Sequence, residues 1–136
     1  MGEEFESFIG KHHILNLCTC CDSLSWSSSC FYAFNGNCFI FASDKKTRHM
    51  QNIAKNPFVS GTIALETKEV GLIQGLQFEG SVKKASISSK KFYFKIYPFA
   101  RALFPMLWEI DISYAKLTDN RLGFGKKLEW KIDLQR

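Results

Sequence analysis

Apolar and polar residues alternate with a period of two along the C-terminal part of the chain. Segments 108–114 (WEIDISY) and 128–134 (LEWKIDL) place an apolar side chain at every second position. This period is typical of β-strands with one buried face, so both segments are predicted as strands. Segments 13–21, 58–65 and 71–85 are apolar or alternating as well, and the sequence predicts strands there too.

A hairpin is predicted where Asn35-Gly36-Asn37 separates two further strand candidates, 25–34 and 38–43. Asn and Gly tolerate the positive φ angles of a tight turn between antiparallel strands. Six or seven strands with mostly short connections favour an antiparallel barrel, because barrel closure also removes exposed strand edges.

Two segments have helical spacing instead. Residues 3–11 place their apolar side chains on one face, which predicts a short amphipathic helix. A second helix is predicted from Lys45 after a cap by Ser43 or Asp44, and Asn56-Pro57 ends it. The predicted fold is therefore mainly β (α+β) with short flanking helices.

Composition limits the classes of function. A chain of 136 residues fits one domain, 1–136, and its 46% hydrophobic and 23% charged residues match a globular protein. A net charge of +5 suits an anionic small molecule and is too small to indicate nucleic acid. The acidic start and the lack of an apolar run that could span a bilayer predict a cytoplasmic protein without a membrane partner.

The five cysteines are predicted to be free thiols, since their number is odd and the expected compartment is reducing. The run CTCC at 18–21 invites a metal interpretation. A tetrahedral zinc site needs a second pair of ligands at suitable spacing, and the sequence has none, so no metal is expected.

The basic segment 41–57 (FASDKKTRHMQNIAKNP) has two interpretations. Its lysines and arginine could face water on a capped amphipathic helix, as most runs of charge do. Alternatively, free N–H groups at the helix start, together with the hydroxyls of Ser43 and Thr47 and the guanidinium of Arg48, could hold a phosphate. Composition alone favours the solvated helix face and leaves the phosphate site as the alternative.

The stretch FIFASDKKTRHMQNIAKNPFVSGTI resembles the phosphate-binding segment of the FMN-binding split barrels, the pyridoxamine 5'-phosphate oxidase-like family. Segment 108–130 (WEIDISYAKLTDNRLGFGKKLEW) is similar to a small, uncharacterised bacterial branch of it, the YhbP-like proteins. The resemblance covers nearly the whole chain. It implies a split barrel, a homodimer with FMN at the subunit interface, and a small-molecule redox substrate.

The resemblance also implies which residues would contact FMN, although Gln74 and Gln77 could equally face solvent and segment 123–125 could be an ordinary glycine-rich turn. No catalytic side chain is implied. The implied contacts are Ser43, Thr47, Arg48 and His49 at the phosphate; Ser28, Ser29, Cys30, Phe31 and Tyr32 along the ring; Gln74 and Gln77 near the ring; and Phe124, Lys126 and Lys127 toward the partner's flavin.

Two departures from the family pattern limit the transfer of activity. His49 stands where the family usually has lysine, so part of the phosphate's charge compensation would depend on histidine protonation. The Arg-x-His substrate motif of the true oxidase is missing from the C-terminal segment GKKLEWKIDLQR, so oxidation of B6 vitamers is not expected.

Three functions remain: a flavin-dependent oxidoreductase, a binder or sensor of FMN or a related tetrapyrrole without turnover, and a cofactor-free structural dimer. Segment 88–107 interleaves basic and aromatic residues and is predicted to be partly helical, with breaks at Pro98 and Pro105. Such composition also occurs in single-strand binders and membrane-surface helices. Packing over the barrel and a dimer contact are favoured, because the aromatic side chains are needed to cover the core.

Overall fold

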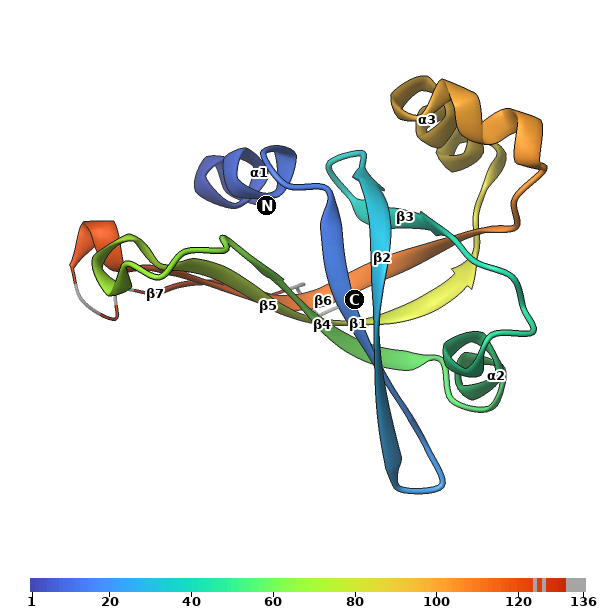
Figure 1. Ribbon diagram of the computed structural model, residues 1–136, viewed down its shortest axis with the longest axis horizontal. Helices are drawn as coiled ribbons and strands as arrows, with labels where there is room; N and C mark the ends of the chain where they lie inside the picture. The colour runs from blue at the N-terminus through green and yellow to red at the C-terminus, as the bar shows by residue number, and fades with distance from the viewer. Residues whose placement is uncertain (124, 126, 132–136) are drawn as a thin grey trace.

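One antiparallel sheet closes on itself in the computed structural model, which describes residues 1–123, 125 and 127–131 (Figure 1). The sheet order is β3-β2-β1-β4-β5-β6-β7, and a further pairing of β3 with β6 closes the barrel. The strands are β1 (Ile14–Cys21), β2 (Leu24–Phe34), β3 (Cys38–Ala42), β4 (Phe58–Ala64), β5 (Gln74–Lys84), β6 (Leu107–Asp119) and β7 (Lys127–Lys131).

Strands β1 to β6 form the closed barrel, and β7 lies outside the closure on one edge of β6. The first part of β6, Leu107 to Asp111, pairs with β3, and the later part, Tyr114 to Thr118, pairs with β7. The predicted antiparallel barrel of six to seven strands with short flanking helices is therefore confirmed.

Three α-helices flank the barrel: α1 (Glu3–Gly10), α2 (Arg48–Lys55) and α3 (Ile87–Ile96). Short 3₁₀ helices are η1 (Val70–Leu72), η2 (Pro98–Leu103) and η3 (Asn120–Leu122). Among the described residues, no helix has the length and apolar character needed to cross a membrane.

The start of α2 was predicted wrongly. The helix begins at Arg48 rather than at Lys45, because Thr47 is its N-cap and the Thr47 hydroxyl accepts a hydrogen bond from the Met50 N–H (3.3 Å). The Asp44 carboxylate instead accepts from the Lys46 N–H (2.8 Å), which turns the chain before the helix can begin.

The inward side chains of the strands make a continuous core whose largest fully buried members include Phe39, Phe41 and Phe78. Helix α1 closes the barrel beside the start of β1, and the Tyr32 hydroxyl donates to its Ile9 carbonyl (2.6 Å). Helix α2 closes the other end of β1, where the Asn52 amide donates to the Thr19 hydroxyl (3.0 Å). The two ends of the barrel are thus sealed by different helices (Figure 1).

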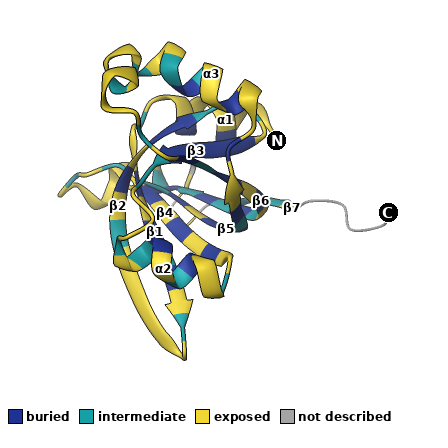
Figure 2. Ribbon diagram, turned by 90° about the vertical axis from the view of Figure 1, so that its right-hand side faces the viewer, coloured by how far each residue is buried: buried dark blue, intermediate teal, exposed yellow. Residues whose placement is uncertain are grey.

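Helix α3 packs on the outside of the barrel, against β2 and β3. Its buried Tyr93 joins a second apolar cluster with Ala33, Ile40 and Leu107. Figure 2 shows α3 and α2 on the same side of the molecule, at opposite ends, with β3 between them.

Candidate functional site

Three side chains meet between the end of β3 and the start of α2. The Ser43 hydroxyl lies 2.6 Å from His49 Nε2 and 3.3 Å from the Thr47 hydroxyl, and Thr47 Oγ1 lies 3.3 Å from the same His49 nitrogen. We call these residues, with Arg48, the α2 cluster. The structure thus brings Ser43, Thr47 and His49 together at the start of α2, next to Arg48.

The backbone at the start of α2 adds further donors. The N–H groups of Arg48 and His49 have no acceptor within the described part of the chain. Free N–H groups and the helix dipole make such a position favourable for an anion. The Asp44 carboxylate is engaged by the Lys46 N–H.

Arg48 reaches from α2 to β2, where its guanidinium carbon lies 4.1 Å from the ring centre of Trp26. No ion pair occupies Arg48 among the described residues. Stacking on a ring face leaves the edges of the guanidinium free for bidentate contact with an oxyanion. Trp26 was not predicted as a site residue, and its one signal in the sequence is an indole inside the serine-rich run SLSWSSS.

Strand β2 has an open edge beside this cluster. Only Tyr32, Ala33 and Phe34 pair with β3, whereas residues 24–31 pair, within the described chain, with β1 alone. The Ser28 hydroxyl oxygen is buried here and makes no hydrogen bond of good geometry among the described residues, although it lies near the Cys30 thiol and acts to lower that thiol's pKa. A buried polar group without a partner is unusual and marks a position where an external group could bind.

An apolar border lies next to the polar cluster. The Ser43 N–H donates to the Met106 carbonyl (3.0 Å), and the Trp108 indole N–H donates to the Ser43 carbonyl (2.8 Å). Met106 is 44% exposed and Phe31, on the open part of β2, is 60% exposed. The site therefore combines anion-binding donors with exposed apolar surface.

The electrostatics of the cluster depend on one cation. Burial lowers the pKa of His49, so its imidazole is mostly neutral at neutral pH. Arg48 remains charged. Burial also raises the pKa of the neighbouring β2 residues Cys30 and Tyr32, so both stay protonated.

The β2 residues of the predicted site alternate in direction. Cys30 and Tyr32 are buried in the barrel, whereas Phe31 is exposed and the Ser29 hydroxyl donates to the Asn16 side chain (3.0 Å) on the outer face. A ligand lying along this edge would meet the backbone and only some of the side chains.

The two glutamines are not brought together. Gln77 lies in a polar groove of about 370 Å³ on the outer face of the sheet, with Asn16 and Tyr114. The Gln74 side chain accepts from Arg121 (3.0 Å). Lys127 is exposed on β7, and the predicted Phe124 and Lys126 lie outside the described residues.

No metal centre is formed by the described part of the chain. It contains no cluster of three or more His, Cys, Asp or Glu side chains with suitable geometry, and all five cysteines are free.

No protein-family model matches the chain. Its sequence is 35% identical over 130 residues to the UPF0306 protein plu4501 of Photorhabdus laumondii, covering 91% of each chain. It is 34% identical over 129 residues to a UPF0306 protein of Yersinia pestis biovar Antiqua, covering 90% of this chain and 88% of the relative.

Solved structures share the fold at low sequence identity. A heme-binding protein of Mycobacterium smegmatis superposes with a TM-score of 0.81 at 14% identity over 95% of this chain, which spans 57% of that protein. HutZ, the heme storage protein of Vibrio cholerae, gives 0.63 at 17% identity, covering 81% and 88% of the two chains. An FAD-binding protein of Mesorhizobium loti gives 0.71 at 12%, covering 84% and 89%.

Proposed function

The chain belongs to the UPF0306 family, and from that premise we propose that it binds FMN and acts as a flavin-dependent oxidoreductase. The observation that carries the proposal is the α2 cluster: hydroxyls, a guanidinium and free helix N–H groups converge beside an open strand edge. Oxyanions bind at such positions because hydrogen bonding and the helix dipole favour the same charge.

The residues fit the two chemical parts of the cofactor. Arg48 and the hydroxyls of Ser43 and Thr47 would hold the phosphate, and His49 would donate one hydrogen bond while uncharged. The open edge of β2, with the unpartnered Ser28 hydroxyl and the exposed Phe31, would face the ring system. A planar apolar ligand with an anionic tail would match this arrangement, with its tail at the α2 cluster and its ring along the edge of β2.

The chain's own contribution would be to bind, to orient and to exclude water. The bound flavin would supply the hydride and electron chemistry, which requires no acid or base from the protein. A homodimer with the cofactor at the subunit interface is part of the proposal, because a second subunit would cover the apolar border of the site.

Heme binding is the second candidate, supported by a heme-binding protein and a heme storage protein that share the fold. The α2 cluster could hold a propionate as well as a phosphate, since both are oxyanions. The absorbance spectrum of the purified protein, with mass spectrometry of the released ligand, separates the candidates. Bleaching by NADH or NADPH and reoxidation by air would distinguish an oxidoreductase from a binder.

The phosphate assignment is tested by titrating FMN and riboflavin into the apoprotein and its Arg48→Ala variant. Loss of a charge-assisted bidentate contact should weaken FMN binding at least about tenfold. Riboflavin, which lacks the phosphate, should bind both proteins equally. Lys55→Ala, which removes a positive charge from the other end of α2, is the matched control and should change FMN binding less than about twofold. Unchanged FMN affinity in Arg48→Ala would contradict the assignment.

A further inference from the structure

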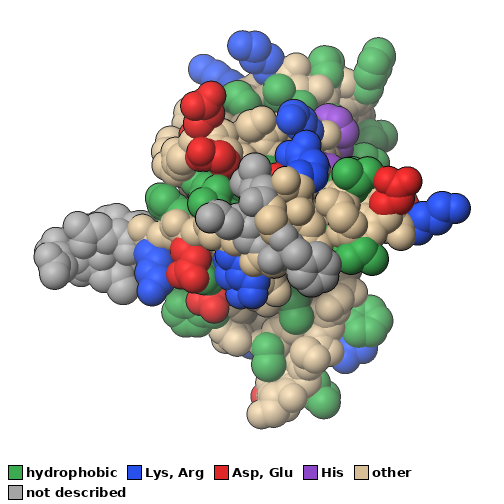
Figure 3. All heavy atoms as spheres, turned by 90° about the vertical axis from the view of Figure 1, so that its left-hand side faces the viewer, with side chains coloured by type: hydrophobic (Ala, Val, Ile, Leu, Met, Phe, Trp, Pro, Cys, Tyr) green, Lys and Arg blue, Asp and Glu red, His purple; other side chains and the backbone are tan. Residues whose placement is uncertain are grey.

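The charged side chains of the segment that links β5 to β6 are all basic. From Gly80 to Trp108 the sequence contains six lysines and arginines and no acidic residue. Lys83 pairs with Asp111 (3.1 Å), but Lys90, Lys91, Lys95 and Arg101 are exposed and form no ion pair among the described residues. The face in Figure 3 differs, because acidic and basic side chains are interspersed on it.

The same segment exposes large apolar side chains. Phe99 is 93% exposed, Phe104 91% and Leu103 80%, and we call these three residues the apolar tip. Exposure this complete means that the side chains protrude and do not line a groove. Ile87 and Ile96, at the two ends of α3, are exposed as well.

The apolar tip is not needed to cover the barrel. The packing expected from the sequence is provided by Tyr93 and by the partly buried Phe92, Phe94 and Tyr97. The Tyr97 hydroxyl also donates to the Tyr32 carbonyl (2.5 Å). The tip residues lie beyond this contact.

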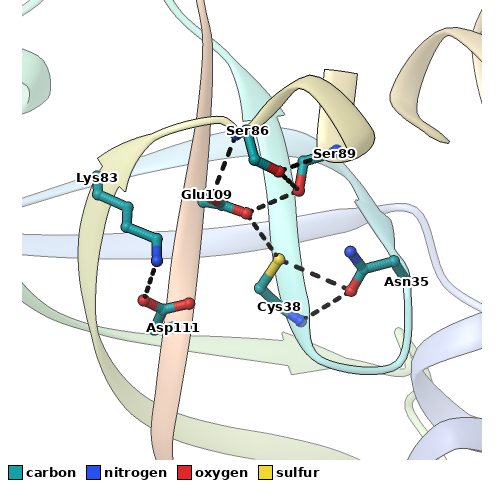
Figure 4. A network of polar contacts seen from close by, with 7 residues as sticks. All are labelled: Asn35, Cys38, Lys83, Ser86, Ser89, Glu109 and Asp111. Carbon is teal, nitrogen blue, oxygen red and sulfur yellow. Dashed lines mark hydrogen bonds and ion pairs between the residues drawn. The ribbon is translucent and has the colours of Figure 1, made fainter. Parts of the chain in front are cut away.

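The base of the segment is firmly attached, so its exposure does not reflect a loose loop. Figure 4 shows the Glu109 carboxylate of β6 accepting hydrogen bonds from the Ser89 hydroxyl (2.7 Å), the Cys38 thiol (3.2 Å) and the Ser86 N–H (3.3 Å). Ser86 is also the N-cap of α3. We call this set the Glu109 anchor. It fixes the start of α3 on the barrel.

We propose that α3 and η2 form a docking surface for an anionic lipid membrane, with the apolar tip entering the interface and the four cations facing lipid headgroups. Exposed apolar side chains flanked by Lys and Arg are the features that bind peripheral proteins to such surfaces. The proposal does not depend on FMN. It replaces the expectation of no membrane partner, which rested on the lack of a spanning segment, because peripheral docking needs no such segment.

Three observations favour lipid over other partners. A protruding tip needs no complementary groove in a bilayer, whereas a protein partner must supply one. In a two-fold symmetric contact centred on this surface, its unpaired cations would lie against the partner's cations. The aliphatic Leu103, Ile87 and Ile96 suit acyl chains better than nucleobases, which prefer aromatic stacking.

The test is co-sedimentation of the full chain with vesicles of phosphatidylcholine, with and without about 30% phosphatidylglycerol. We expect at least about tenfold stronger binding to the anionic vesicles, weakened by salt. The double variant Phe99→Ser/Phe104→Ser should lose that binding. Phe58→Ser, which alters a phenylalanine that is 71% exposed on β4, is the matched control and should retain it.

The charge requirement has its own control. Lys90→Gln/Lys91→Gln/Lys95→Gln should lose binding to anionic vesicles. The triple variant Lys68→Gln/Lys116→Gln/Lys131→Gln, outside α3 and η2, should not.

Equal binding to neutral and anionic vesicles, or equal loss in the tip and Phe58 variants, would overturn the proposal. The membrane proposal would also be overturned if the protein does not bind vesicles and the Phe99→Ser/Phe104→Ser variant is monomeric in light scattering where the wild type is dimeric. The same holds if the protein does not bind vesicles and this variant loses oligonucleotide binding.

Discussion

Trp26 gives Arg48 a fixed direction. A free arginine at a helix start samples many rotamers, and ordering it on binding costs entropy. The indole of Trp26, on the open part of β2, lies against one face of the guanidinium at 4.1 Å. The cation–π contact therefore orients the charge before an anion arrives and joins α2 to the unpaired strand edge.

Trp26→Ala should weaken FMN binding by about 2- to 5-fold, because a partly exposed cation–π contact contributes about 0.5–1 kcal/mol. Trp26→Phe keeps a ring and should lose less. The measurement is a flavin fluorescence titration, with riboflavin as the phosphate-free control. Equal FMN affinity in wild type and Trp26→Ala would show that the indole does not position Arg48.

The sequence located part of the candidate site and missed part of it. Ser43, Thr47 and Arg48 are close in the chain, so their spacing was enough to place them together. Trp26 and Met106 come from distant segments, and only the register of β2 and the start of β6 brings them to the cluster. Contacts of this kind leave no local pattern in a sequence.

At the scale of elements, the alternation of apolar and polar residues predicted the strands well, because it follows from the burial of one face of each strand. The end of β6 was predicted at 114, but the strand continues to Asp119, since β5 and β7 both pair with its later half. The start of α2 was predicted wrongly for a different reason. Ser43, Asp44 and Thr47 can each cap a helix, and the choice depends on which of them the preceding turn uses.

Ser89→Ala should lower the free energy of unfolding by about 1.5–3 kcal/mol, since it removes a hydrogen bond to a buried carboxylate. Urea denaturation measures this. The loss should be accompanied by faster hydrogen exchange in α3, because Ser89 attaches that helix to β6. Ser88→Ala, one position earlier and exposed, is the matched control and should stay within about 0.5 kcal/mol of wild type.

The same carboxylate makes the Glu109 anchor sensitive to acid. Burial acts to raise the pKa of Glu109, but the Ser89, Cys38 and Ser86 donors outweigh it and hold the pKa below its usual value. The folded state then binds fewer protons than the unfolded state, so stability rises with pH through this range. The contribution is complete above about pH 4.5 and is lost as the pH falls through the folded-state pKa.

The difference in unfolding free energy between wild type and Glu109→Gln should therefore shrink as the pH falls below about 4.5. Asp111→Asn, on the same strand but in an exposed ion pair with Lys83, should show a much smaller dependence. A pH-independent difference for Glu109→Gln would show that the carboxylate's charge does not stabilise the anchor.

At the scale of the whole molecule, two glycines let the strands approach closely enough to curve. A Cβ at Gly80 would lie 2.3 Å from the Asp111 carbonyl oxygen, and one at Gly61 would lie 2.6 Å from the Asn16 carbonyl oxygen. Gly80 also stands at a register shift between β5 and β6. Bulges and small residues of this kind bend a sheet toward closure.

Gly80→Ala should destabilise the fold by about 1–3 kcal/mol, because the atom in the way belongs to the backbone and cannot rotate aside. Gly75→Ala on the same strand is the control. Its nearest neighbour would be 3.7 Å away, so little change is expected. Urea denaturation of wild type and both variants measures their free energies of unfolding. Equal values for Gly80→Ala and Gly75→Ala would mean that the barrel does not require close approach of the strands at Gly80.

The closing strand β3 carries a thiol that lies beneath α3. Cys38 begins this five-residue strand and is 4% exposed. Burial and the neighbouring Glu109 carboxylate raise the pKa of its thiol to about 12. Alkylating reagents attack thiolates, so they can modify Cys38 only when the packing of α3 over it opens. The rate of its labelling, compared with that of the exposed Cys20, would thus measure the opening of the Glu109 anchor without any introduced probe.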